Sequence, residues 1–156
     1  MTQNPKPIPD TYRRVTPSLV VGDAAAALAF YAEVFGAIER ARIPGPGGAI
    51  AHAEIEIGDS VVMLSDAFPE RGVKAPAKGE AGTASGIFLY IADVDAVFKK
   101  AVDAGATVTM PLENQFWGDR YGKLRDPFGH EWHLATHVED VSPEEMGKRA
   151  QAAMAG

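Results

Sequence analysis

The strongest constraint in this sequence is an internal repeat at an offset of 70 residues. The segment LVVGD at 19–23 aligns with LYIAD at 89–93, and VML at 62–64 aligns with WHL at 132–134. Between them, Gly36 and Gly105 stand in matching tripeptides one residue out of this register. Agreement at both ends of the unit predicts a duplicated βαβββ module. Each module would bury one helix on one face of a small sheet, so the opposite face must meet the other module, a partner chain or a ligand.

Local signals define the elements within each module. Asp23 is a suitable N-cap for a helix that ends at Gly36, and Asp93 is a suitable N-cap for a second helix that ends at Gly105. The runs with strand character are 18–21, 51–57, 61–65, 87–91, 107–110, 122–125 and 131–136. Near the end of the chain, Ser142 followed by a proline and two glutamates predicts a third helix over about 143–153.

These elements predict the domain organisation. Residues 1–11 form a flexible lead, residues 12–137 form a single domain of two modules, and residues 138–156 form a helical tail. The modules cover about 12–67 and 85–137, and residues 68–84 join them. This connection is long and rich in Gly, Ala and Pro, which is typical either of a mobile loop over a site or of a linker.

Composition narrows the classes of partner. The formal net charge is −6, and no cluster of Lys and Arg exceeds two residues, so the basic surface that nucleic-acid binding needs is missing. No apolar run reaches the length of about 18 residues that indicates a membrane span. The chain has no cysteine, which excludes disulfides and thiolate metal sites. We therefore expect a cytoplasmic protein that handles a small molecule or another protein.

Several segments carry a resemblance to a known family. They are 16–21 (TPSLVV), 29–31 (AFY), 35–37 (FGA), 52–60 (HAEIEIGDS), 116–120 (FWGDR) and 125–132 (RDPFGHEW). In this order and spacing, the sequence resembles the vicinal oxygen chelate superfamily over about residues 12–137. That superfamily includes glyoxalase I, fosfomycin-resistance proteins, extradiol dioxygenases and bleomycin-binding proteins. The motifs are similar to those of its PhnB-like subgroup.

The resemblance implies an α+β fold of the glyoxalase/bleomycin resistance type. Two βαβββ modules would form a curled mixed sheet around a central cleft, with the helices on the outside and a C-terminal helix added here. The resemblance also implies a homodimer, in which the tail helix can pack on the neighbouring subunit.

The resemblance further implies a divalent metal held by one residue from the first and last strand of each module. The corresponding positions are Thr16, Met63, Gly86 and His133. Of these, only His133 is a good ligand, because glycine has no side chain, a thioether is soft and a neutral hydroxyl binds poorly. We therefore expect no cofactor and no conventional metal site, and a divalent metal would need a non-standard shell.

Strand alternation places His133 and Glu54 on the cleft face of their strands, and we treat them as the candidate catalytic pair. His133 can act as a base or a ligand, and Glu54 can orient its second nitrogen or supply a carboxylate. In the alternative interpretation, His133 is a hydrogen-bonded pocket or core histidine, and Glu54 is a solvated or salt-bridged strand residue.

Further side chains are candidates for ligand binding. They are Ser18, His52, Met63, Phe88, Tyr90, Trp117 and Arg120. Trp117 can stack on a flat ligand, and Arg120 can grip a carboxylate or phosphate oxygen, although Arg120 can equally pair with Asp119 while Trp117 plugs the cleft mouth. His130 is expected to be exposed, and the sequence suggests no partner for His137.

Three functional hypotheses remain open at this point. The leading one is a glyoxalase/bleomycin-resistance-like protein that binds a small organic molecule without a conventional metal. The second is a lyase, isomerase or dioxygenase that uses His133 with Glu54. The third is a partner-binding module that uses the connection at 67–85 and the acidic surface.

Overall fold

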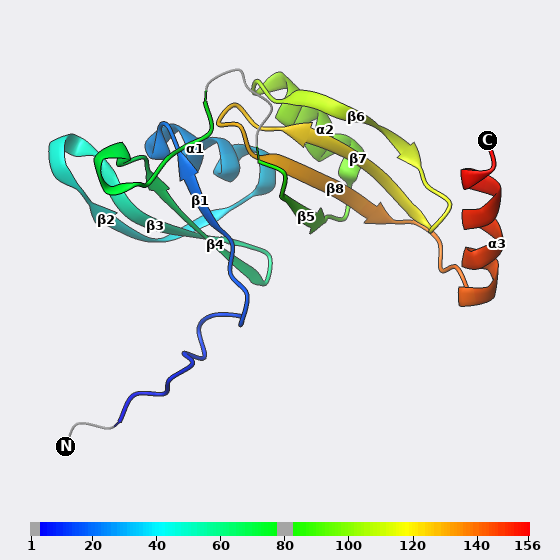
Figure 1. The fold of residues 1–156 in the computed structure, drawn as a ribbon, viewed down its shortest axis with the longest axis horizontal. Coiled ribbons are helices and arrows are strands. Elements are labelled where there is room, and N and C mark those ends of the chain that lie inside the picture. Colours follow the sequence, from blue (N-terminus) through cyan, green and yellow to red (C-terminus); the bar gives the residue numbers. More distant parts are fainter. Residues whose placement is uncertain (1–3, 78–82) are drawn as a thin grey trace. The chain divides into compact units, whose positions relative to one another are not determined.

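The computed structural model describes residues 4–77 and 83–156. The chain divides into two compact units, Met1–Pro76 and Ala77–Gly156, which we call unit 1 and unit 2. Each unit holds one four-stranded sheet, and the two sheets share the same strand order (Figure 1). The α+β fold of two βαβββ modules followed by a C-terminal helix is therefore confirmed. The union of both modules around one central cleft stays a prediction.

Unit 1 forms its sheet from the first four strands. Its elements are β1 (Ser18–Val21), α1 (Ala24–Phe35), β2 (Ile38–Pro44), a short 3-10 turn (Pro46–Gly48), β3 (Ile50–Ile57), β4 (Ser60–Asp66) and a second 3-10 turn (Pro69–Arg71). The strand order is β1-β4-β3-β2, with β1 parallel to β4 and the other pairs antiparallel.

Unit 2 repeats this plan. Its elements are β5 (Gly86–Tyr90), α2 (Val94–Asp103), β6 (Thr107–Asn114), β7 (Asp119–Arg125), β8 (Glu131–His137) and α3 (Pro143–Met154). The strand order is β5-β8-β7-β6, again with a parallel first pair.

The repeat extends to individual contacts. Ser18 pairs with Met63 in unit 1, and Phe88 pairs with His133 in unit 2, so both partners are shifted by the same 70 residues. The N-cap roles of Asp23 and Asp93 are confirmed, because their side chains accept from the backbone N–H groups three residues ahead at 2.9 and 3.0 Å. The two modules therefore share a register and a way of starting the helix.

A second contact also ties each helix to its sheet. The carboxylate of Asp66 accepts from the N–H of Ala24 at 2.7 Å, and the hydroxyl of Thr136 accepts from the N–H of Val94 at 2.9 Å. Both contacts join the last strand of a module to the first turn of its helix, where backbone N–H groups lack helical partners.

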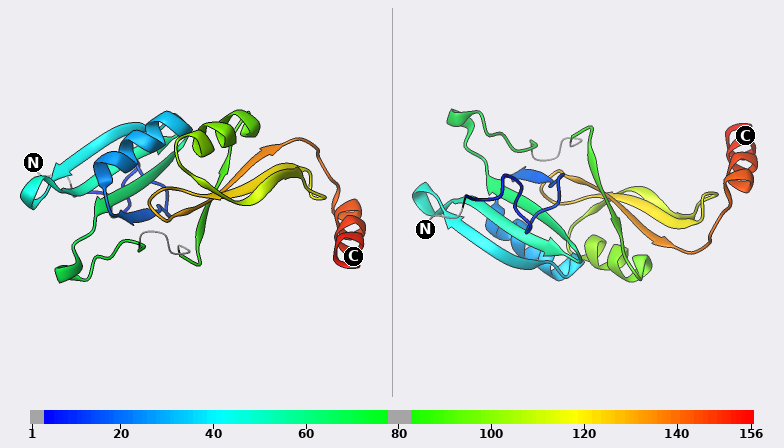
Figure 2. Two further views of the ribbon diagram at one scale, coloured as in Figure 1. Left: turned by 90° about the horizontal axis from the view of Figure 1, so that it is seen from above. Right: turned by 90° about the horizontal axis from the view of Figure 1, so that it is seen from below.

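Each helix covers one face of its own sheet (Figure 2). Tyr31 of α1 and Ile55 of β3 are buried in the core of unit 1, and Trp132 and Leu134 of β8 are buried in the core of unit 2. The strands therefore alternate as predicted, with apolar residues under the helix. The opposite face of each sheet carries the polar and aromatic residues considered below.

Two strand boundaries differ from the sequence prediction. The strand β2 was not predicted, because its residues include three charged side chains and it forms the edge of the sheet, where neither face is fully buried. The strand β7 begins at Asp119 rather than at Gly122, so Arg120 and Tyr121 lie in a strand and not in a loop.

Residues 68–84 contain a 3-10 turn and an isolated bridge between Phe68 and Val73, and positions 78–82 of this predicted connection lie outside the described residues. Residues 1–3 of the predicted lead also lie outside them. None of the described helices is long and apolar enough to cross a membrane.

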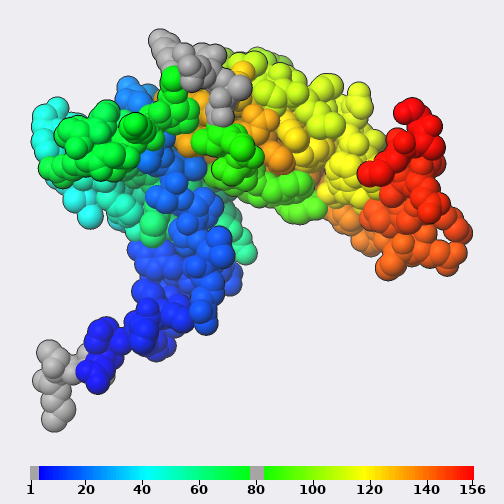
Figure 3. Space-filling view, viewed as in Figure 1, coloured from blue at the N-terminus to red at the C-terminus, as the bar shows by residue number. Residues whose placement is uncertain are grey.

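The predicted C-terminal helix is confirmed as α3. Its N-cap is Ser142, which accepts from the N–H of Glu145 at 3.2 Å. Arg149 ties this helix back to unit 2: it bonds both carboxylate oxygens of Glu139 at 2.8 and 2.9 Å and the carbonyl of Phe116 at 3.3 Å. In the space-filling view, α3 lies in red against the end of the β6–β7 hairpin (Figure 3).

The turn that follows β7 is held by a buried aspartate. Asp126 is 4% exposed, and its carboxylate accepts from the N–H groups of Phe128 and His130 and from the indole of Trp132, each at 2.9 Å. Because it lies inside this turn, His130 is buried, and the expectation of an exposed His130 is wrong. The turn therefore positions the largest side chain of the core.

We predict that Asp126→Ala destabilises the protein by about 3 kcal/mol, because it leaves three buried donors without their acceptor. Chemical denaturation measures the effect. The control is Asp59→Ala, which removes an exposed carboxylate 3.6 Å from Arg13 and should cost less than about 1 kcal/mol. Equal losses for the two variants would contradict the role given to Asp126.

Candidate functional site

The face of the unit 2 sheet that α2 does not cover carries a group of rings, which we call the aromatic face. It consists of Phe88, Tyr90, Trp117, Tyr121 and His133. Phe88 and Tyr121 stack with their centroids 5.6 Å apart and an interplanar angle of 15°. Phe88 is 46% exposed and Tyr90 is 60% exposed, so two rings remain open to a partner.

His133 lies at the centre of this face. Its Nδ1 is 3.0 Å from the hydroxyl of Tyr121, while among the described residues Nε2 has no hydrogen-bond partner. A Cβ at Gly86 would lie only 2.6 Å from Nε2, so the glycine provides the space that the imidazole occupies. Burial, and next the charge of Lys123, lowers the pKa of His133 against the opposing charge of Glu131.

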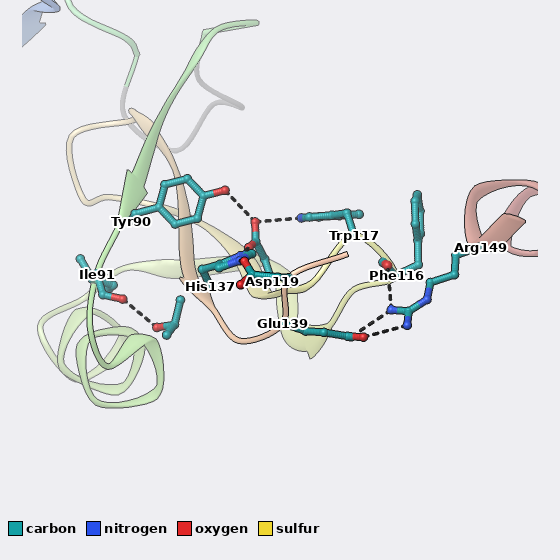
Figure 4. Close-up of polar contacts among 10 residues, drawn as sticks. Tyr90, Ile91, Phe116, Trp117, Asp119, His137, Glu139 and Arg149 are labelled. Carbon is teal, nitrogen blue, oxygen red and sulfur yellow. Dashed lines mark hydrogen bonds and ion pairs between the residues drawn. The ribbon is translucent and has the colours of Figure 1, made fainter. Parts of the chain in front are cut away.

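A buried carboxylate fixes two of the rings (Figure 4). Asp119 is 2% exposed, and one of its oxygens accepts from the hydroxyl of Tyr90 at 2.8 Å and from the indole N–H of Trp117 at 2.9 Å. Its other oxygen is 2.9 Å from Nδ1 of His137. Burial alone would raise the pKa of Asp119, but these three hydrogen bonds together lower it. The two rings are therefore oriented before any ligand arrives.

His137 connects this carboxylate to the surface. Its Nε2 is 2.8 Å from the carboxylate of the exposed Asp140, so the imidazole lies between two anions. These contacts raise the pKa of His137, with the bond to Asp140 as the largest cause and the bond to Asp119 next. The sequence gave no partner for His137, because both anions become neighbours only through the β7–β8 pairing and the following loop.

The structure separates Arg120 from the aromatic face. Arg120 makes two 2.7 Å bonds to the carboxylate of Asp95 on α2, so the alternative in which it pairs with Asp119 is wrong. Alternation along β7 explains the difference: Arg120 points toward the helix, whereas Asp119 and Tyr121 point to the opposite face. Had the strand been predicted from Asp119, the same alternation would have identified both residues.

In unit 1, Glu54 is the centre of a different cluster. It is 5% exposed, and one oxygen accepts from the hydroxyl of Tyr12 at 2.7 Å and lies 3.0 Å from Nε2 of His52. The other oxygen is 3.3 Å from Nε of Arg40, whose guanidinium also lies over the ring of Tyr12. The bond to His52, and next the bond to Tyr12, lowers the pKa of Glu54. Both oxygens of this carboxylate are engaged.

The remaining predicted ligand-binding residues of unit 1 lie in one row across the sheet. Ser18 on β1 pairs with Met63 on β4, and Met63 pairs with Glu54 on β3. Cross-strand neighbours project to the same face, so these side chains and that of His52, two residues from Glu54, share a face. His133 belongs to unit 2, and its joint action with Glu54 stays a prediction.

The residues at the family's metal positions do not form a suitable donor set. Gly86 offers no donor, and Met63 offers only a thioether. The hydroxyl of Thr16 already donates to the carbonyl of Arg13 at 3.2 Å, which leaves His133 as the one strong ligand of the four. The described residues also contain no group of three or more His, Cys, Asp or Glu side chains that could hold a metal. We derive no step through a metal.

We predict that Glu54→Gln destabilises the protein by about 2 kcal/mol, because an amide cannot satisfy the three donors that now surround the carboxylate. Chemical denaturation measures the effect. The matched control is Glu39→Gln on the neighbouring strand, which removes an exposed ion pair with Arg42 and should cost less than about 1 kcal/mol. Equal costs would show that Glu54 is an ordinary surface carboxylate.

We also predict that His137 stabilises the protein more at low pH than at high pH. Its pKa is raised in the folded state, so its stabilisation is complete below about pH 6.5 and is lost as the pH rises through the folded pKa. The unfolding free energies of the wild type and His137→Gln should therefore differ more in acidic than in alkaline buffer. A difference independent of pH would contradict the two ion pairs.

Comparison with known proteins agrees with this architecture. The family model described as the Glyoxalase/Bleomycin resistance protein/Dioxygenase superfamily matches residues 13–134. A Mycobacterium bovis protein, described as uncharacterized, is 46% identical over 142 residues, which cover 90% of this chain and 91% of that protein.

Solved structures share the fold as well. The crystal structure of TioX from Micromonospora is 27% identical, covers 81% of this chain and 99% of its own, and has a TM-score of 0.61. A gene product from Arabidopsis thaliana is 29% identical, covers 80% of this chain and 98% of its own, and has a TM-score of 0.63. The family model spans both units, and the sheets and helices follow the predicted duplication, so this chain belongs to the Glyoxalase/Bleomycin resistance protein/Dioxygenase superfamily.

Proposed function

We propose that this protein binds a small organic molecule on the aromatic face of unit 2, without a conventional metal site. The observation that carries the proposal is the pair of open rings, Phe88 and Tyr90, beside a histidine whose Nε2 has no bonding partner among the described residues. Exposed aromatic groups are costly in water, and they bind flat molecules by stacking. A polar atom at the centre of such a surface supplies orientation.

The fixed orientation of the rings supports a binding role. Tyr90 and Trp117 both donate to the buried carboxylate of Asp119, so binding need not first order these side chains. A surface that is already ordered loses less conformational entropy when it meets a ligand. The cost of burying Asp119 is offset by three hydrogen bonds, and that arrangement orients rings that are not all needed for the core.

The surroundings of Glu54 favour binding over acid–base catalysis with His133. A general base needs a free oxygen and a pKa near the working pH. Both oxygens of Glu54 already contact donors, and its pKa is lowered further from neutrality. The enzyme hypothesis therefore lacks the second residue on which it was based. Assignment to the PhnB-like subgroup, a homodimer and a cytoplasmic location stay part of our proposal, and they rest on the sequence motifs.

We predict that wild-type protein binds the uncharged planar probe 2-naphthamide and that Phe88→Ala weakens this binding about tenfold, the equivalent of about 1.4 kcal/mol of lost stacking. Isothermal titration calorimetry in the presence of a chelator measures both affinities and removes adventitious metal. The control is Val102→Ala, which truncates an exposed apolar residue on α2. The proposal fails if the wild type does not bind, or if Phe88→Ala and Val102→Ala bind equally well.

A further inference from the structure

A row of three side chains crosses the aromatic face. In the register of the sheet, Phe88 on β5 pairs with His133 on β8, and His133 pairs with Lys123 on β7. Directly paired residues project to the same side of a sheet. A phenyl ring, an imidazole and an ammonium group therefore follow one another across about 10 Å, which is two strand spacings.

The ammonium of Lys123 has no anionic partner. Among the described residues, no carboxylate lies within ion-pair distance of it, whereas Lys99 and Lys148 in the same unit each pair with an acid four residues away. Lys123 is also half-buried, so part of its hydration is lost. An unpaired and partly buried cation is unfavourable in the free protein, and an anion would relieve that cost.

The other charged groups near this row leave a positive local field. Glu131 lies two residues from His133 on β8, and its carboxylate accepts from the hydroxyl of Thr109 at 2.5 Å. Arg125 stands directly opposite Glu131 in the strand register and carries the opposite charge. Asp119, at the far end of the face, is surrounded by its three donors. Lys123 is the charge of this row that these pairings do not balance.

His133 adds a donor beside the ammonium. When the hydroxyl of Tyr121 donates to Nδ1, the neutral imidazole carries its proton on Nε2. That nitrogen lies over Gly86, where no side chain covers it. A ligand oxygen placed between His133 and Lys123 would accept a hydrogen bond from one and meet the charge of the other.

We propose that the aromatic face binds planar aromatic molecules that bear an anionic oxygen group, with the ring on Phe88 and the oxygen group at Lys123 and His133. This inference rests on the proposed function and adds the charge of the ligand to it. A fused bicyclic carboxylate has the right dimensions, because the lysine side chain spans part of the distance from β7 to the ring on β5.

The test compares two probes with the same ring and different charge, 2-naphthoate and 2-naphthamide, by isothermal titration calorimetry in low salt. Wild-type protein should bind the carboxylate about tenfold more tightly, and the ratio should fall as salt is added. Lys123→Gln should bring the ratio close to one, while Lys123→Arg should keep it. Lys100→Gln, on the helix that covers the opposite face, is the matched control and should keep it too.

The outcomes separate the two proposals. Binding of both probes with a preference for naphthoate that depends on Lys123 supports the inference. Binding of both probes with no preference, or with a preference that survives in Lys123→Gln, overturns the inference about charge and leaves the proposed function in place. Absence of binding for either probe overturns the proposed function and this inference together.

Discussion

The parallel pair between the first and last strand of each unit is the constraint on which the other features depend. Parallel neighbours cannot be joined by a tight turn, so the chain must pass through a helix and two further strands before it returns. That return makes β8 the neighbour of β5 and brings His133 next to Phe88. The same return makes β4 the neighbour of β1 and brings Met63 next to Ser18. Neither row exists until the module is closed.

Buried carboxylates serve two different purposes in unit 2. Asp126 holds a turn and the indole of Trp132, and its effect is confined to the core side of the sheet. Asp119 bonds rings that lie on the open side, one of which is the 60% exposed Tyr90. Both are satisfied by three donors, as burial of a charge requires. The difference lies in what they orient: the protein's own core in one case and a surface for a partner in the other.

The family's metal positions show how a shared fold can support a different chemistry. In unit 2, glycine at one position opens the space that the imidazole at the other position fills. The imidazole then bonds Tyr121 and lies between a phenyl ring and an ammonium group. These surroundings suit a hydrogen bond to an organic molecule, and they lack the oxygen and nitrogen donors that a divalent ion needs. Function in such a family follows from the residues of the site and not from the fold.

Much of the fold could be predicted from local patterns in the sequence. The repeat at an offset of 70 residues, the caps Asp23 and Asp93, and the alternation that buries Trp132 are all short-range signals, because caps and strand faces depend on neighbours in the chain. The edge strand β2 escaped prediction because a strand with two exposed faces shows no alternation. Partners of charged side chains escaped prediction for a different reason, since Asp95 and Asp119 compete for the same kinds of donor.

The sequence by itself therefore determined the duplicated module, its helices and the residue types at the family's metal positions. Only the tertiary structure decided that Arg120 pairs with Asp95, that His137 lies between Asp119 and Asp140, and that Lys123 is left beside His133. The physical reason is that these contacts join strands and helices distant in the chain. Their geometry depends on strand register, and a shift of one residue in that register turns every side chain to the other face.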